Sequence, residues 1–569
     1  MSLSIVGKTL TASTLLIASV GSLAVTAQTL PIAQRTDRLT QPQTLPSPLP
    51  TTKPQIAPPT APITPPQNSS TPIAVRKIVV TGSTVLTTTE LANLTQPLEG
   101  KSATLQELQS LADQITQLYL ERGYITSRAI VAQQKITDGI VSIQVIEGSL
   151  DLIEVQGNSR LNNSYILNRV KLGTGSPLNK NNLEDKLQLL KSDPLLSEVN
   201  ANLQPGKESG KSKLIVRVKE ASALTGNITF DNYSPPSVGS ERLGGTIAYR
   251  NVTGMGDELR ATYFRSLAGG SNLYDFSYKV PVNAMNGTIQ LRYSPSNSKI
   301  IDPAFSSFGI RSQNDLYELT YRQPVIRSPR EELALSLGFA LQNGQTFLFD
   351  NSPTPFGIGP DANGNSRTRV IKFGQDYVRR DPKGAWSLQS QFNFGIGALD
   401  ATINPSPIPD GRFFSWTGQV QRVQQLTPNQ LLIAQADVQL SANSLLPSQQ
   451  FTIGGGQSVR GYRQGVRSGD NGIRFSLEDR ITLKRDQKTG RSIIQIAPFA
   501  DLGTVWNNSK NPNASSSQNF LAAAGLGIIV EPVPNLLMRL DYALPLVNLS
   551  DRGGNAQDNG LHFSMGYSF

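Results

Sequence analysis

The sequence predicts a membrane β-barrel preceded by two small α+β domains, and three observations predict this fold. From about residue 221 to the end of the chain at residue 569, apolar and polar residues alternate with a period of two, and helical periodicity is absent. Upstream of this region, one pattern of strands and helices occurs twice. Beyond residue 27, no segment offers the roughly 18 consecutive apolar residues of a membrane helix. Since lipid satisfies no backbone hydrogen bonds, such a chain crosses a membrane only as a closed barrel.

The composition argues against enzymatic chemistry. The 569 residues are 38% apolar and 17% charged, which is typical of a folded protein. Cysteine is absent, so disulfides and thiolate metal sites are excluded, and the single histidine, His562, leaves little scope for zinc, triad or imidazole-base chemistry. We therefore predict no enzyme activity, no catalytic residue, no metal site and no cofactor. The net charge of +10 is spread along the chain rather than gathered in basic runs, so we expect no nucleic-acid partner.

The first 72 residues are predicted to be a signal peptide followed by a linker. Residues 1–27 contain Lys8, an apolar run and the small-residue ending Val25-Thr26-Ala27, the pattern of a secretory signal peptide. Residues 28–72 hold 12 of the chain's 37 prolines, which is typical of an extended linker. At about 3.1 Å per residue this linker could reach on the order of 140 Å, enough to cross a cell-wall layer or thread a pore. A plain disordered spacer is the alternative.

Residues 73–148 and 149–220 are predicted to be two copies of one α+β domain. Each copy begins with a strand that ends in a glycine turn, at Gly82 and, 75 residues later, at Gly157. In the first copy, a capping box that begins at Thr104 starts a helix with one apolar face. The predicted order of strand, helix, helix, strand and strand covers one sheet face and leaves sheet edges free. An ordinary α+β domain without a ligand is the alternative.

Residues 221–569 are predicted to form the barrel. Along residues 274–280 and 333–341 every second residue is apolar, which directs those side chains towards lipid or a core. Residues 561–569 are apolar at every odd position and end on an aromatic residue. A large soluble β-sandwich or a propeller would also alternate. The signal peptide and the ending of the chain favour the membrane barrel.

The most distinctive stretch is a glycine-rich loop within residues 446–472. Three consecutive glycines begin at Gly454, and no helix or central strand would keep a backbone of that freedom. Arg460 lies close to the apolar side chains of Val459 and Tyr462, and a guanidinium in such surroundings calls for a carboxylate partner inside the fold. A solvated arginine on an ordinary surface hairpin is the alternative.

This loop resembles the sixth extracellular loop of the two-partner secretion transporters, the haemolysin secretion/activation proteins of type V secretion. In that family an element that here reads Val459-Arg460-Gly461-Tyr462 folds back into a barrel of about sixteen antiparallel strands. Residues 499–503 resemble the wall motif whose inward aspartate receives the loop arginine, so the resemblance implies that Asp501 pairs with Arg460. Alternation agrees, because Phe499 and Asp501 fall on one face of their strand. The implied loop-to-barrel lock comprises Val459, Arg460, Gly461, Tyr462, Phe499, Asp501 and Gly503.

Further patterns extend the resemblance over about residues 73–569. Each α+β copy resembles a polypeptide-transport-associated (POTRA) domain. Residues 251–259 resemble an early barrel hairpin, where glycine and aspartate form a tight turn with a structural role. Residues 561–569 resemble the terminal strand by which outer-membrane barrels are recognised for assembly. Linker residues 28–72 show no persuasive plug helix of the kind that family members often carry.

The resemblance implies a protein of the outer membrane, with its POTRA domains in the periplasm, that secretes a large partner exoprotein. Its activation of that exoprotein is left open. The implied partners are this client, which would be β-helical, the lipid of the outer membrane, and the barrel-assembly machinery during biogenesis. The POTRA domains would hold the unfolded client at a sheet edge or in a strand-helix groove, without nucleotide. The alternatives are a barrel-assembly factor of the same superfamily, a passive porin or uptake channel, and an enzyme carried in a barrel.

Overall fold

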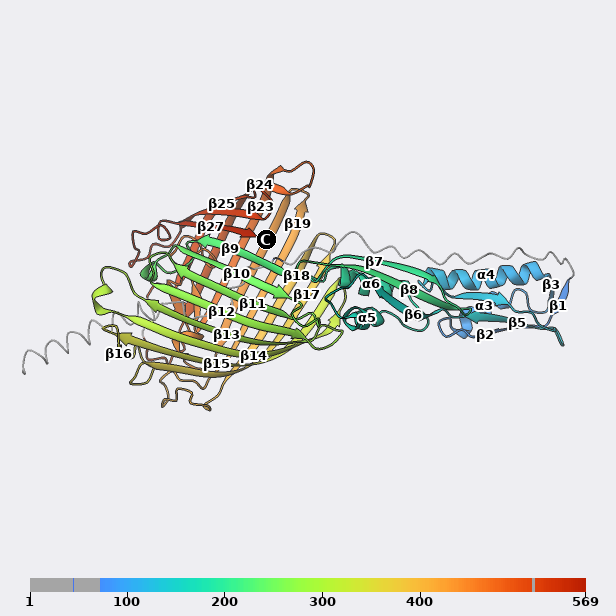
Figure 1. The fold of residues 1–569 in the computed structure, drawn as a ribbon, viewed down its shortest axis with the longest axis horizontal. Coiled ribbons are helices and arrows are strands. Elements are labelled where there is room, and N and C mark those ends of the chain that lie inside the picture. Colours follow the sequence, from blue (N-terminus) through green and yellow to red (C-terminus); the bar gives the residue numbers. More distant parts are fainter. Residues whose placement is uncertain (1–44, 46–71, 514–516) are drawn as a thin grey trace, which may run out of the picture. The chain divides into compact units, whose positions relative to one another are not determined.

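The computed structural model describes Leu45 and residues 72–513 and 517–569, which form two compact units (Figure 1). One unit comprises residues 72–222 with 253–256, and the other comprises Leu45 and residues 223–252 and 257–569. The predicted signal peptide, and the predicted linker apart from Leu45 and Pro72, lie outside the described residues. Within the described ranges, no helix has the length and apolarity that a membrane crossing requires.

Residues 73–148 form a three-stranded sheet covered by two helices, in the predicted order of strand, helix, helix, strand and strand. In the sheet, β5 lies between β2, to which it is parallel, and β4, to which it is antiparallel. The predicted capping box is present, because Thr104 Oγ1 accepts a hydrogen bond from the N–H of Glu107 at the start of α4. A short ladder of β1 and β3 was not anticipated. The elements are β1 Ile73–Val75, β2 Lys77–Thr81, α3 Thr88–Thr95, β3 Lys101–Ala103, α4 Leu105–Glu121, β4 Arg128–Val131 and β5 Ile140–Ile146.

Residues 149–220 repeat this architecture. Here β8 lies between β6, to which it is parallel, and β7, to which it is antiparallel, and each copy has its own apolar core. The two sheets therefore each have two strands with an unpaired edge among the described residues, β2 and β4 in one and β6 and β7 in the other. The elements are β6 Ser149–Gln156, α5 Asn163–Lys171, α6 Lys180–Lys191, β7 Leu196–Pro205 and β8 Lys211–Glu220.

The two copies share one detail of their glycine turns. Gly82 and Gly157 both have positive φ. A Cβ added to Gly82 would lie 2.4 Å from the carbonyl oxygen of Val145, and one added to Gly157 would lie 2.2 Å from that of Val218. Two residues after each valine, a glutamate carboxylate accepts backbone N–H groups of the turn, from Thr84 in the first copy and from residues 159–161 in the second. The turn thus needs glycine for a close backbone approach, and the end of the last strand holds it in place.

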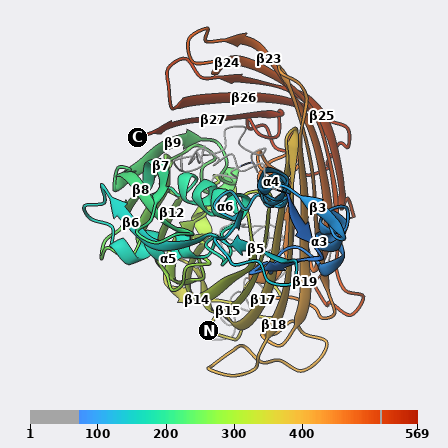
Figure 2. The same ribbon diagram turned by 90° about the vertical axis from the view of Figure 1, so that its right-hand side faces the viewer.

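Sixteen of the described strands close into an antiparallel barrel in which β27 pairs with β9 (Figures 1 and 2). The two-residue strand β16 (Ser352–Pro353) pairs beside β15, and short 3-10 turns lie in three connections. The wall strands are β9 Leu224–Asp231, β10 Arg242–Arg250, β11 Glu258–Ser266, β12 Ser271–Pro281, β13 Thr288–Lys299, β14 Arg311–Arg327, β15 Glu331–Leu348, β17 Asn365–Asp381, β18 Gly384–Gly395, β19 Phe414–Thr427, β20 Gln430–Ser441, β23 Asn471–Arg485, β24 Ser492–Trp506, β25 Phe520–Val530, β26 Leu536–Pro545 and β27 Leu561–Ser568.

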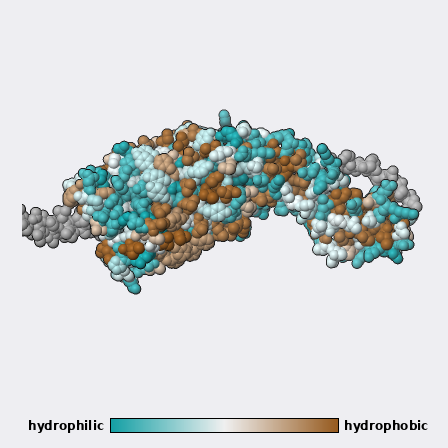
Figure 3. All heavy atoms as spheres, turned by 60° about the horizontal axis from the view of Figure 1, so that its bottom comes forward, coloured by the Kyte–Doolittle hydropathy of each residue, from teal (hydrophilic) through white to brown (hydrophobic). Residues whose placement is uncertain are grey.

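The outer face of the barrel carries the apolar residues that alternation predicted. Leu335, Leu337 and Phe276 are among the exposed apolar side chains, and Figure 3 shows brown apolar side chains spread over the barrel. The inner face carries charged residues such as Asp275 and Arg292, which form an ion pair at 2.5 Å. The segment 251–259 makes the predicted turn between β10 and β11. An apolar outer surface with paired charges inside is the pattern of a barrel that meets lipid.

Candidate functional site: a loop held inside the barrel

The glycine-rich loop lies inside the barrel rather than on an outer surface. It runs over residues 454–466, between the short strands β21 (Phe451–Ile453) and β22 (Arg467–Gly469), which pair with each other. Gly454, Gly455 and Gly461 have φ between +91° and +104°, a conformation that a larger residue would adopt only with strain. Val459 and Tyr462 are buried in an apolar cluster with residues of the barrel wall. The loop is therefore packed as part of a core.

Arg460 and Asp501 form the pair that the resemblance implied. The guanidinium Nε and Nη2 atoms donate to the two carboxylate oxygens at 2.7 and 2.9 Å, and the backbone N–H of Arg460 donates to the same carboxylate at 3.1 Å. The guanidinium carbon also lies 3.3 Å from the ring centroid of Phe499. Both charged side chains are nearly inaccessible to solvent, with exposures of 6% and 0%. A buried bidentate pair of this kind combines strength with a defined geometry.

Glycines of the wall and loop make this approach possible. A Cβ on Gly503 would lie 3.2 Å from Val459 Cγ2, and one on Gly461 would lie 3.2 Å from the Cβ of Ala543. The structure thus brings all seven predicted lock residues into one cluster. The strand parity predicted for Phe499 and Asp501 is also observed, because both are buried while Leu502 is exposed on the outer face.

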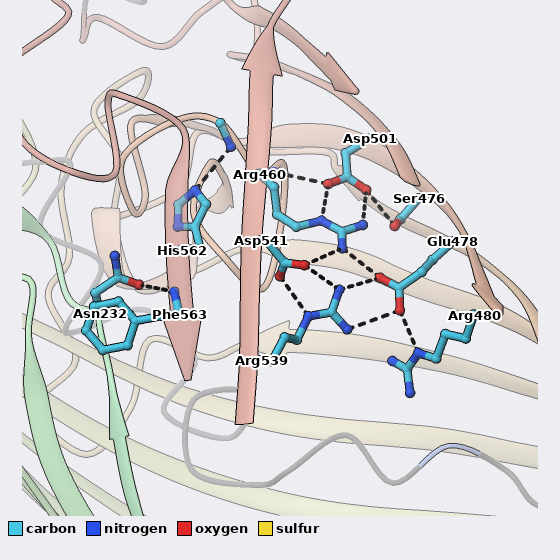
Figure 4. Close-up of polar contacts among 11 residues, drawn as sticks. Asn232, Arg460, Ser476, Glu478, Arg480, Asp501, Arg539, Asp541, His562 and Phe563 are labelled. Atoms are coloured by element: carbon cyan, nitrogen blue, oxygen red, sulfur yellow. Dashed lines mark hydrogen bonds and ion pairs between the residues drawn. The ribbon is translucent and has the colours of Figure 1, made fainter. Parts of the chain in front are cut away.

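The rest of the charge network was not predicted from the sequence (Figure 4). Glu478 on β23 accepts from Arg460 Nη1 at 2.6 Å and from Arg539 Nη2 at 2.6 Å. On β26, Arg539 also donates to Asp541 at 2.7 and 2.9 Å. Alternation could have found Arg539 and Asp541, which occupy the inward positions of an otherwise apolar strand. With Arg480, which donates to Glu478 at 2.7 Å, three arginines face three carboxylates.

Two neutral contacts hold the loop tip from its other side. The N–H of Gly461 donates to Nε2 of His562 on β27 at 3.1 Å, so the imidazole acts as a neutral acceptor. The hydroxyl of Tyr462 donates to the carbonyl of Ala522 at 2.8 Å and accepts the N–H of Val547 at 3.1 Å. This role of His562 was not predicted from the sequence. Its position in the inward register of the last strand was the available signal.

A polar cavity of about 590 Å³ adjoins the loop. Its lining includes Gln421, Gln435, Gln495, Arg474, Arg480 and Arg539. Within the described residues, His, Asp and Glu side chains form no cluster that could hold a metal ion. The arrangement can hold a loop inside a polar lumen, because the buried positive and negative charges balance.

Comparisons with known proteins agree with this architecture. Residues 210–530 match the family described as haemolysin secretion/activation protein ShlB/FhaC/HecB, and residues 73–148 match the ShlB-type POTRA domain. The chain belongs to this haemolysin secretion/activation family. It is 25% identical over 450 residues to the outer membrane transporter CdiB of Dickeya dadantii, covering 78% of each chain. It is 24% identical over 513 residues to the heme/hemopexin transporter protein HuxB of Haemophilus influenzae, covering 87% of this chain and 86% of the relative.

Solved structures share the fold of this family member. CdiB from Escherichia coli has a TM-score of 0.67 at 23% identity, covering 89% of this chain and 93% of that one. BamA from Haemophilus ducreyi, lacking POTRA domains 1–3, has a lower TM-score of 0.53 at 16% identity, covering 88% and 100%. The chain is thus an outer-membrane barrel with an N-terminal POTRA domain in the periplasm, and it acts as a two-partner secretion transporter. The assembly-factor alternative fits less well, because the matching family is that of secretion/activation proteins.

Proposed function

We propose that this transporter secretes one large exoprotein, or a few, and that the loop 454–466 is the gate through which export is controlled. The observation that carries this proposal is the contrast inside the barrel. A lumen with a polar cavity of about 590 Å³ is occupied by a loop whose anchor, Arg460, binds two buried carboxylates. The interior of an outer-membrane barrel is polar, and it is either a water-filled channel or is plugged by a loop or a helix. Balanced, reversible ion pairs suit a segment that must leave and return.

The client is captured in the periplasm by backbone pairing. The edges of β2, β4, β6 and β7 are unpaired within the described residues, and an extended client could add to any of them as a further strand. Backbone hydrogen bonds supply affinity with little demand on sequence, which suits an unfolded chain of any composition. Export needs no cofactor and no enzymatic step, because folding of a β-helical client outside the cell would draw it through. Outer-membrane lipid and the barrel-assembly machinery are the other partners we propose.

The test is export of a large exported β-helical protein, which is first sought in the reading frames that neighbour that of this chain. We expect the intact transporter to release it into the medium. Deletion of residues 73–148 should leave the barrel inserted, with heat-modifiable migration in gels, and should abolish release. Arg460→Ala should also insert and should export poorly. Full export by the deletion variant would contradict client capture. Restored insertion of other barrels in cells depleted of their assembly factor would favour the assembly alternative.

A further inference from the structure

The gate has a second anchor in the connection between β26 and β27, at the end of the barrel where β9 ends. We call residues 546–560 the strap. Arg467 of β22 forms a bidentate pair with Asp551 of the strap at 2.8 and 3.0 Å, and Arg463 reaches the same carboxylate at 2.7 Å. The strap keeps its shape through Asp558, which accepts the N–H of Gly553 at 3.0 Å and the amide of Asn555 at 2.6 Å. These contacts lie apart from the network around Asp501.

Gln557 lies three residues before the end of the strap and is fully buried. Its Oε1 accepts the N–H of Gln464 in the loop at 2.8 Å. Its Nε2 donates to the carbonyl of Ser234 at 2.7 Å and to the carbonyl of Asn232, both in the connection that follows β9. The Gln557 amide therefore binds two parts of the barrel. Its oxygen accepts a hydrogen bond from the loop, and its nitrogen donates to the connection that follows β9. A carboxylate could serve only the first of these roles, because it has no N–H to donate.

These bonds cross the seam where the barrel closes. The strands β27 and β9 share five residue pairs, from Ser564↔Asp231 to Ser568↔Asn227, against seven pairs between β27 and β26. Beyond Asp231, the backbone N–H of Asn232 donates to the carbonyl of Phe563 at 3.3 Å, and the Asn232 side chain accepts the N–H of Phe563 at 3.0 Å (Figure 4). The same side chain donates to the carbonyl of Leu561 at 2.9 Å. Gln557 makes the next bonds outward. At this end of the seam, side chains thus supply four hydrogen bonds beside one between backbone groups.

We propose that Gln557 is a positioning residue that couples the loop to the closing seam. While the loop is in the lumen, the amide of Gln557 holds the strap over it and joins β27 to β9. When the loop leaves, the bond from Gln464 and the pairs with Asp551 break, and the strap is free to release the outer end of the seam. This inference rests on the proposed gating by residues 454–466. It adds that loop and seam move together.

The loop half of the proposal is tested with a buried reporter. The chain has no cysteine, so Val459→Cys, at a fully buried loop position, reacts with a maleimide only when the loop leaves. In this background, Gln557→Glu should raise the labelling rate on the order of tenfold, as expected for loss of buried hydrogen bonds. Gln557→Met, which removes both sets of bonds without adding charge, should act in the same direction. Asn559→Asp is the matched control, because it adds the same charge at an exposed strap position and should label as the parent does.

The seam half is tested by a reversible cross-link. Phe230 and Met565 are directly opposed across the seam, at a spacing that suits a disulfide when both are changed to cysteine. In planar bilayers, Gln557→Glu should increase the open fraction of the purified full-length channel. Oxidation of the Phe230→Cys, Met565→Cys pair should cancel that increase, and a reducing agent should restore it. If Gln557 had only a structural role, the cross-link would not change the open fraction of the Gln557→Glu channel.

Each outcome decides between the ideas. If Gln557→Glu and Gln557→Met both label at the parent rate, Gln557 does not hold the loop. If the open fraction stays high when the seam is cross-linked, loop and seam are independent. Arg460→Ala in the Val459→Cys background separates these failures from failure of the gate itself. Fast labelling of that variant beside slow labelling of the Gln557 variants would keep the gate and overturn the coupling.

Discussion

The Asp501 carboxylate binds both the backbone and the side chain of Arg460. The carboxylate accepts the backbone N–H of Arg460 at 3.1 Å and the guanidinium at 2.7 and 2.9 Å, so it fixes the position of the loop as well as the direction of the side chain. Ser476 donates to the same carboxylate at 2.6 Å. A wall residue that holds a loop in this way is a suitable point at which to test whether the loop acts as a gate.

We expect Arg460→Ala and Asp501→Ala each to impair secretion and to raise the resting conductance while the barrel still reaches the membrane. Breaking one partner of a buried pair costs roughly 3 to 5 kcal/mol, because the other charge is left unpaired. The double variant should cost less than the sum of the two single losses, since the residues act as a unit. Conductance in planar bilayers and export into the medium are the measurements. Strictly additive losses would indicate that the pair is not coupled.

The packing of Gly503 against Val459 predicts a size-compensation effect. A Cβ on Gly503 would approach Val459 Cγ2 to 3.2 Å and Ile453 Cγ2 to 3.3 Å, so Gly503→Ala should push the loop from the wall and raise the resting conductance. Gly503→Ala combined with Val459→Ala should return the conductance towards that of the parent, because the second change removes the contacting methyl groups. An equal effect of Gly503→Ala with and without Val459→Ala would show that this contact does not seat the loop.

The turn glycines of the periplasmic copies predict a stability effect. Gly82→Ala should lower the free energy of unfolding of a soluble fragment of residues 73–220 by at least about 2 kcal/mol, because it combines a strained φ with a 2.4 Å approach to Val145 O. Gly100→Ala is the control, since Gly100 has a similar φ of +75° and no atom within 4 Å of its added Cβ. Urea unfolding followed by circular dichroism measures both. If both variants lose the same free energy of unfolding, backbone strain alone accounts for the effect and the close approach to Val145 plays no part.

The strap predicts how the channel responds to acid. Partial burial alone would raise the pKa of Asp551, but hydrogen bonds and charges from Arg467 and Arg463 outweigh it and hold the pKa at about 2. A depressed pKa contributes stability that is complete above the ordinary value of 3.8 and is lost as the pH falls towards 2. The resting conductance should therefore stay constant from about pH 8 to pH 5 and rise only below about pH 4.

Asp551→Asn tests this assignment. At neutral pH it should conduct more than the parent, because the arginines lose their charged partner. The part of the acid response that Asp551 supplies should disappear. The change should be smaller than that of Asp501→Ala, since the Asp551 side chain is 46% exposed and solvent screens its ion pairs. A parent channel that opens between pH 7 and pH 5 would assign the response to another group.

The sequence by itself determined the features that depend on local chemistry. The period-two alternation placed Phe499 and Asp501 on one face because successive side chains of a strand point to opposite sides. The capping box at Thr104 located the start of α4 because it is satisfied within one turn of helix. The glycines around Arg460 marked a backbone with φ values that other residues avoid. None of these inferences requires knowledge of distant segments.

The tertiary structure alone decided which inward residues meet. Arg460 and Arg539 are 79 positions apart, and both bind Glu478 because the loop folds inward beside a stretch of wall in which only β24 and β25 separate β23 from β26. The inward fold of the loop also brings Gly461 to the His562 imidazole, and barrel closure brings the Gln557 amide to the end of β9. Alternation assigns the strand residues Glu478, Arg539 and His562 to the inner face but carries no information about distance around the barrel. Such partners are chosen by the register and closure of the whole sheet, which are properties of all its strands together.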